Sequence, residues 1–233
     1  ASPHAAAGAA LVISQGVTNP SEVERILQDS SDDSQRDRFD DENEYRERYG
    51  SGIMQAAAAV QQANLGPGGV RFAGGLLLIA LAAFGVRRKD ILGMRPSTGP
   101  LLVGSTVMVS SGLFFLPALL GDAGLCCGLI EGLAHPLAEL DMTLLGADFH
   151  QNPLLASALL PLGAYALLGG HTTGRKLAAG IALGMSAFCL TEVYLMTSDV
   201  RWIPGMAGLV DQGWLLVNGL ASFAIGYLGL KRR

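Results

Sequence analysis

The stretch GLIEGLAHPLAEL, residues 128–140, places three side chains that can exchange protons or bind metals in a very apolar chain. Glu131, His135 and Glu139 follow one another at intervals of four residues, a spacing that puts them on one face of an α-helix. Pro136 breaks this stripe, because proline disfavours the helical conformation at the preceding residue and suits the start of a new helix. The stretch predicts either a histidine that ligates a metal or a pigment magnesium, or an interfacial histidine hydrogen-bonded to a carboxylate.

Other polar residues lie inside apolar segments. Glu192, in the stretch CLTEVYLM, is a candidate proton relay, ion site or counter-charge, because carboxylates inside a membrane are costly. Arg71 is expected to extend its charged end outward to the membrane surface. Asp211 and Asn218, seven residues apart, favour a packing role between helices. The three cysteines are expected to be small buried hydrophobic residues.

Signatures of catalysis are missing from the sequence. The GPGG stretch at residues 66–69 is not followed by the Lys-Ser/Thr of a phosphate-binding loop, and no Gly-x-Ser-x-Gly motif occurs. The spacing around His135 matches neither a zinc hydrolase nor a di-iron protein. We therefore expect a protein that is not an enzyme, with no metal-binding residues apart from the pigment ligand considered above.

The composition identifies an integral membrane protein. Half of the 233 residues are hydrophobic, 15% are charged, and the mean hydropathy is +0.37. Residues 22–48 hold eleven acidic and five basic residues, whereas residues 50–233 share nine acidic and eleven basic ones. The sequence predicts an all-α fold with an acidic, partly helical extramembrane arm at residues 1–66 and a helical transmembrane domain at residues 67–233.

Five apolar segments are expected to cross the membrane, because a bilayer core of about 30 Å needs roughly 20 helical residues. The predicted spans are residues 70–86, 99–121, 153–170, 177–198 and 212–230, and residues 122–152 are expected to be interfacial or re-entrant. An Ala-rich helix before the first span is expected to end at residues 66–69. The start of the chain at Ala1 suggests a mature product from which a targeting peptide has been removed.

The basic residues predict the orientation. In a five-span arrangement the basic clusters at residues 87–95, 175–176 and 231–233 all fall on one side of the membrane. Basic loops favour the side from which the protein inserts. The N-terminal arm is then expected on the opposite side.

The stretch Glu131-Gly132-Leu133-Ala134-His135 resembles the photosystem I reaction-centre subunit XI family (PsaL), as do residues 143–146 and 177–195. The resemblance covers at most about 70 residues and implies that Glu131 and His135 bind chlorophyll. It also implies a plastid thylakoid membrane and carotenoid as a second pigment. In that membrane the basic clusters predict the N-terminus in the lumen and the C-terminus in the stroma. Pro136, the additional spans and the N-terminal orientation depart from that family.

These patterns together favour a non-catalytic accessory subunit of a photosynthetic, photosystem I-like complex of the chloroplast. Its partners are expected to be other membrane subunits, lipids and pigments, and not nucleic acid. Two alternatives stay open: an accessory subunit of a respiratory complex in a mitochondrial or bacterial inner membrane, and a small transporter or membrane enzyme. The second would use Glu192 and the group formed by Glu131, His135 and Glu139.

Overall fold

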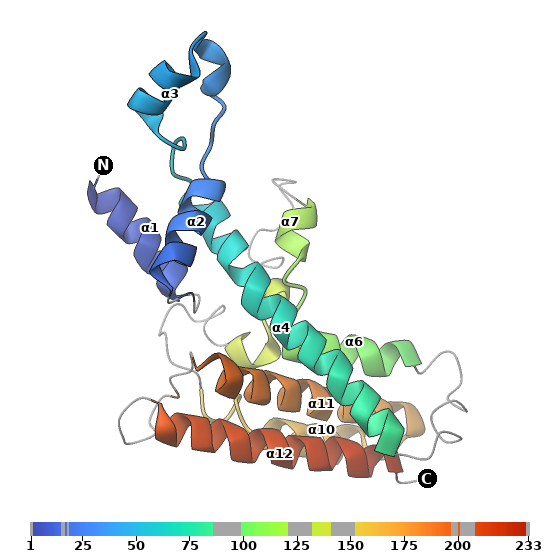
Figure 1. Cartoon of the computed structure of the whole chain (residues 1–233). Helices are drawn as coiled ribbons and strands as arrows, with labels where there is room; N and C mark the ends of the chain where they lie inside the picture. The colour runs from blue at the N-terminus through green and yellow to red at the C-terminus, as the bar shows by residue number, and fades with distance from the viewer. Residues whose placement is uncertain are drawn as a thin grey trace. The chain divides into compact units, whose positions relative to one another are not determined.

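The computed structural model describes residues 2–14, 17, 19–85, 99–120, 132–140, 152–196, 200 and 208–231 (Figure 1). These residues form α-helices and short 3-10 helices, and they include an isolated antiparallel bridge between Asp32 and Ile53. The predicted all-α class is confirmed for this part of the chain. The chain divides into two compact units, Ala1–Pro67 and Gly68–Arg233, which we call unit 1 and unit 2.

Unit 1 begins with two helices that pack against each other, α1 (Ser2–Ser14) and α2 (Pro20–Asp29) (Figure 1). Helix α2 is strongly amphipathic and turns Val23 and Ile26 inward. The small core of this unit consists of Val12, Val17, Val23, Ile26, Ala59 and Ala63. Asn19 caps α2, because its side chain accepts a hydrogen bond from the backbone N–H of Ser21 at 3.0 Å.

The charged stretch of unit 1 folds into a lobe whose ends are tied together. The backbones of Asp32 and Ile53 exchange hydrogen bonds of 2.8 and 2.9 Å, which close a loop holding η1 (Arg36–Arg38) and α3 (Glu42–Tyr49). Helix α3 ends at Gly50, whose φ of +61° favours glycine. Inside the lobe Phe39, Tyr45 and Tyr49 pack ring against ring.

Helix α4 (Ala56–Gly85) is longer than the sequence pattern predicts. The expected end at residues 66–69 is wrong, because the helix continues through Pro67 into the segment predicted as the first span. A proline removes one backbone hydrogen bond and often kinks a helix without ending it.

Unit 2 is built around α11 (Thr172–Leu195), whose middle is almost fully buried. Helices α6 (Gly99–Ser110), α10 (Leu159–Leu168) and α12 (Leu209–Lys231) each pack against it, as Figure 1 shows for α10 and α12. Close packing follows from small residues. A side chain at Gly184 would clash with Val109 of α6, and one at Gly226 would press on Leu183.

Within the described part of the chain, three helices are long and apolar enough to span a membrane: α4, α11 and α12. The other two predicted spans are shorter in the structure. The segment 99–121 is interrupted after α6, and α7 begins only at Leu116 and ends at Leu120; the segment 153–170 becomes helical only at Leu159. The predicted membrane class is thus compatible with the fold, while five complete spanning helices are not seen among the described residues.

Candidate functional site: a buried ion-pair network

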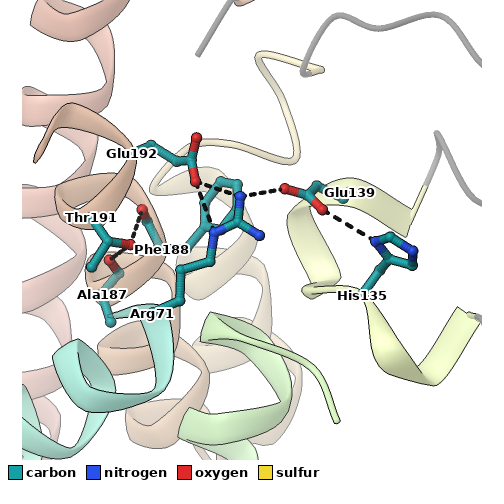
Figure 2. A network of polar contacts seen from close by, with 7 residues as sticks. All are labelled: Arg71, His135, Glu139, Ala187, Phe188, Thr191 and Glu192. Carbon is teal, nitrogen blue, oxygen red and sulfur yellow. Dashed lines mark hydrogen bonds and ion pairs between the residues drawn. The ribbon is translucent and has the colours of Figure 1, made fainter. Parts of the chain in front are cut away.

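One arginine joins two glutamates from distant parts of unit 2. The Nε of Arg71 donates a hydrogen bond of 2.8 Å to Oε1 of Glu192, 121 residues further along the chain. Its Nη2 lies 2.9 Å from Oε1 of Glu139 (Figure 2). The exposed fractions of these side chains are 14% for Arg71, 10% for Glu139 and 2% for Glu192, so the network is shielded from solvent.

Glycines in α4 bring Arg71 close to its partners. A side chain at Gly74 would lie 2.9 Å from the methyl group of Thr191 in α11, and one at Gly75 would lie 2.9 Å from the hydroxyl of Ser110 in α6. Because glycine has no Cβ, the backbone of α4 can approach both helices closely. Arg71 precedes Gly74 and Gly75 by about one helical turn, and its guanidinium therefore reaches α11 directly.

Helix α11 contributes an aromatic ring as well as a carboxylate. Phe188 and Glu192 are four residues apart and therefore share one face of the helix. The Arg71 guanidinium carbon lies 5.2 Å from the centre of the fully buried Phe188 ring, a cation–π geometry. The Phe188 ring covers one face of the Arg71 guanidinium, and the carboxylates of Glu139 and Glu192 contact the nitrogen atoms of the guanidinium.

The third partner, Glu139, lies in the segment 132–140, where short helical turns are separated by a break, and this segment packs against the end of α6. Gly112 follows α6 with a φ of +61°, and a side chain there would collide with the backbone of His135. Next to it the N–H of Leu113 donates a hydrogen bond of 2.8 Å to the carbonyl of Leu133. The close approach at Gly112 and this hydrogen bond together hold the segment against the end of α6.

His135 lies at the edge of the network. Its Nδ1 is 3.5 Å from Oε2 of Glu139, and its side chain is 27% exposed (Figure 2). The predicted break at Pro136 is confirmed: this residue is extended (φ −63°, ψ 152°) and precedes the 3-10 helix η2, Leu137–Glu139. His135 and Glu139 are in contact although the helix is broken between them. Glu131, the other predicted pigment ligand, lies outside the described residues.

The prediction that Arg71 extends outward to the membrane surface is wrong. The arginine turns inward, because pairing with two carboxylates offsets the cost of burying its charge. The sequence reasoning also missed the role of Glu139. The available signal was the presence of opposite charges inside apolar segments, since charges within a membrane usually pair with one another.

Two further polar residues link the helices of unit 2. The side-chain oxygen of Asn218 in α12 accepts a hydrogen bond of 3.0 Å from the backbone N–H of Ala158, just before α10, which confirms its predicted packing role. Asp211 is buried in the first turn of α12, where it accepts a 3.3 Å hydrogen bond from the N–H of Gly208. Cys189 is fully buried as predicted, whereas Cys126 and Cys127 lie outside the described residues.

The network is an arrangement for holding segments together. Its guanidinium and carboxylates are hydrogen-bonded to one another in a poorly solvated place, where a charge that loses its partner is strongly destabilising. Within the described ranges, no group of three or more His, Cys, Asp or Glu residues is placed to hold a metal ion.

The fold and site of the described residues define a mostly helical protein with candidate membrane-spanning helices and a buried charged network. The chain belongs to the family described as Domain of unknown function (DUF5942), whose model matches residues 96–233. No curated protein and no solved structure matches the chain. The matched region contains Glu139 and Glu192, whereas Arg71 precedes it, so the network ties the family region to the helix before it.

Proposed function

We propose that this chain is a non-catalytic, membrane-embedded accessory subunit that stabilises a multisubunit complex. The observation that carries the proposal is the network in which Arg71 is paired with Glu139 and Glu192. Helix α4, helix α11 and the segment 132–140 are fastened at one buried point. Such a fastening gives the unit a fixed shape, which a subunit needs in order to present the same surfaces to its neighbours.

The apolar outer surface of unit 2 supports this role. Large hydrophobic side chains are exposed along α4 and α12, namely Leu76, Leu77, Leu81 and Phe84 in α4 and Leu209, Val210, Trp214, Leu216, Val217, Leu220 and Leu228 in α12. An apolar surface of this extent is suited to lipid or to other membrane subunits and not to water. These are the partners expected from the sequence.

The proposal includes a five-span topology with an acidic extramembrane arm. At 1.5 Å per residue, α6 and α10 measure only about 18 and 15 Å, so the segments next to them must complete the crossing of a core of about 30 Å. The basic clusters then share one side, and the N-terminus and C-terminus face opposite sides. Protease protection of tags at the two ends in sealed vesicles tests this, since protection of both or of neither contradicts it.

We further propose that the complex is photosynthetic and of the photosystem I type, in a plastid thylakoid membrane with the N-terminus in the lumen. The resemblance of residues 131–135 to the reaction-centre subunit XI family supports this, and so does the geometry at His135. Its Nδ1 faces Glu139, which leaves Nε2 as the nitrogen to ligate a chlorophyll magnesium. A carboxylate at the second nitrogen orients ligating histidines in metal sites. A bound chlorophyll would supply light absorption; we assign no residue to carotenoid.

An absorption spectrum of the complex purified with this chain tests the pigment proposal. His135→Leu is expected to remove chlorophyll from the complex, whereas His171→Leu, a change of the same type next to α11, is expected to leave the pigment content unchanged. A complex without chlorophyll bands would contradict the photosynthetic role and favour a respiratory complex of a mitochondrial or bacterial inner membrane.

One observation favours a second candidate, a small proton or ion transporter. The charged network lies where α6 ends and an irregular segment packs in, and transporters often bind ions at interrupted helices. Proton uptake by proteoliposomes containing the chain alone separates the two candidates. Uptake that is lost in Glu192→Gln, a variant of unchanged size, would support transport and contradict the accessory role.

A further inference from the structure

Unit 1 contains an open, mostly apolar groove, and all the residues that line it belong to this unit. It has a volume of about 520 Å³ and is formed by α1, α2 and the segment 51–54. Its apolar lining includes Ala5, Ile13, Val23, Leu27 and Met54, and Glu24 is the charged residue that lines it. Sites that bind ligands commonly have volumes of about 300–1,000 Å³. The groove is therefore large enough to receive several side chains of a partner.

The groove exists because small residues lie opposite large ones. Ala5 and Ala9 of α1 fill little space, while Ile13 remains 49% exposed although its neighbour Val12 is fully buried in the core. Met54 lies against the backbone of α1, since a side chain at Gly8 would come within 2.7 Å of its sulfur. A flexible methionine at a groove can adapt to different apolar partners.

Unit 1, which contains the groove, carries a net negative charge. Residues 1–67 contain eleven acidic and five basic residues. Four of the arginines form ion pairs with acidic residues of the same unit: Arg25, Arg36, Arg46 and Arg48. At the groove itself, the carboxylate of Glu24 accepts a 3.2 Å hydrogen bond from the side-chain amide of Gln28, which carries no charge.

We propose that this groove binds an amphipathic helix of a partner protein that carries lysine or arginine beside its apolar face. The apolar residues of such a helix would enter the groove, as in other helix-in-groove complexes. Its cationic residues would lie next to Glu24 and the acidic surface of α2. The proposal rests on unit 1 alone and stands whether or not the membrane role of unit 2 is correct.

The test uses the full chain in nanodiscs of neutral phosphatidylcholine, because detergent would compete for an apolar groove. The probe is a fluorescent synthetic helical peptide with a leucine face flanked by lysines, and its binding is measured by anisotropy after subtraction of empty discs. The peptide is expected to bind saturably. A second peptide with glutamate in place of every lysine is expected to bind at least about tenfold more weakly, a difference of roughly 1.4 kcal/mol.

Two pairs of variants locate the binding. Ala5→Trp fills the groove and is expected to weaken binding of the lysine peptide at least about tenfold. Ala6→Trp lies on the same helix but outside the groove lining, and it should change the dissociation constant less than about twofold. Glu24→Lys is expected to weaken binding more than Glu47→Lys, although both change the net charge equally. Circular dichroism of each variant verifies that the helices are retained.

Three results would overturn the proposal. One is equal binding by Ala5→Trp and Ala6→Trp, which would exclude the groove as the site. Another is equal binding of the lysine and glutamate peptides, which would exclude the charge of the partner as a determinant. The third is saturable binding of dodecanoate in the groove without binding of the peptide, which would identify the groove as a lipid site.

Discussion

Arg71 and Glu192 form a hydrogen bond of 2.8 Å across 121 residues of chain, and the carboxylate partner is only 2% exposed. A buried pair of this kind makes a modest net contribution while both charges are present, because desolvation opposes the attraction between them. Removing one partner has a much larger effect, since it leaves the other charge buried alone. The network therefore provides a sensitive test of the structure.

Arg71→Leu is expected to destabilise unit 2 by about 3–5 kcal/mol, because both carboxylates lose their guanidinium partner in a poorly solvated place. Thermal unfolding in nanodiscs, followed by circular dichroism, measures the loss. Arg25→Leu is the control: its ion pairs with Glu22 and Asp29 are about half exposed and should contribute less than about 1 kcal/mol. Equal stability of wild type and Arg71→Leu would show that the network is not formed.

Gly184→Ala is expected to destabilise the packing of α11 against α6. The added methyl group would lie 2.7 Å from Cβ of Val109 and 2.6 Å from the carbonyl oxygen of Thr106, so the helices must move apart at a cost of roughly 1–3 kcal/mol. Gly213→Ala in α12 is the matched control, because no atom lies within 4 Å of the added group. The same unfolding measurement applies, and a larger loss for the control would contradict the helix packing described here.

The pKa of Asp32 lies below its ordinary value of 3.8, chiefly because the backbone N–H of Ser34 donates a 2.9 Å hydrogen bond to its carboxylate. A lowered folded-state pKa means that the contribution of this carboxylate to stability is present above the unfolded-state pKa and is lost as pH falls through the lower folded value. Carbon-13 NMR titration of the carboxyl group is expected to give a pKa below 3.8, and Ser34→Pro, which removes the donor, should raise it. A pKa of Asp32 above 3.8 would contradict the turn.

The sequence predicted some elements of the structure better than others. The apolar segments predicted helices, and the structure has helices there, because apolar composition and length are properties of a local stretch. The break at Pro136 was likewise predicted, since the restriction that proline imposes is local. Helix α4 shows the opposite case: Gly66 and Pro67 favour an end, yet the helix continues through them.

The site was harder to predict than the fold. Glu192 was recognised as unusual, but the direction predicted for the Arg71 side chain was wrong. Glu139 was considered as part of the stripe with Glu131 and His135, and not as a partner of Arg71. The reason is physical: a periodic pattern specifies which face a residue occupies, and not which distant segment meets that face. The contact also depends on Gly74, Gly75 and Gly112, which permit close backbone approach and carry no charge signal themselves.

The most direct test of the central claim is the native mass of the solubilised particle that contains this chain, in wild type and in Arg71→Leu/Glu139→Leu/Glu192→Leu. Replacing a whole buried ion-pair network with apolar residues is often neutral for stability. If the network has only a structural role in an accessory subunit, the wild-type chain and the triple variant will each be found in a large complex of the same mass. The account is contradicted if the wild-type chain migrates alone, or if the folded triple variant is absent from the complex.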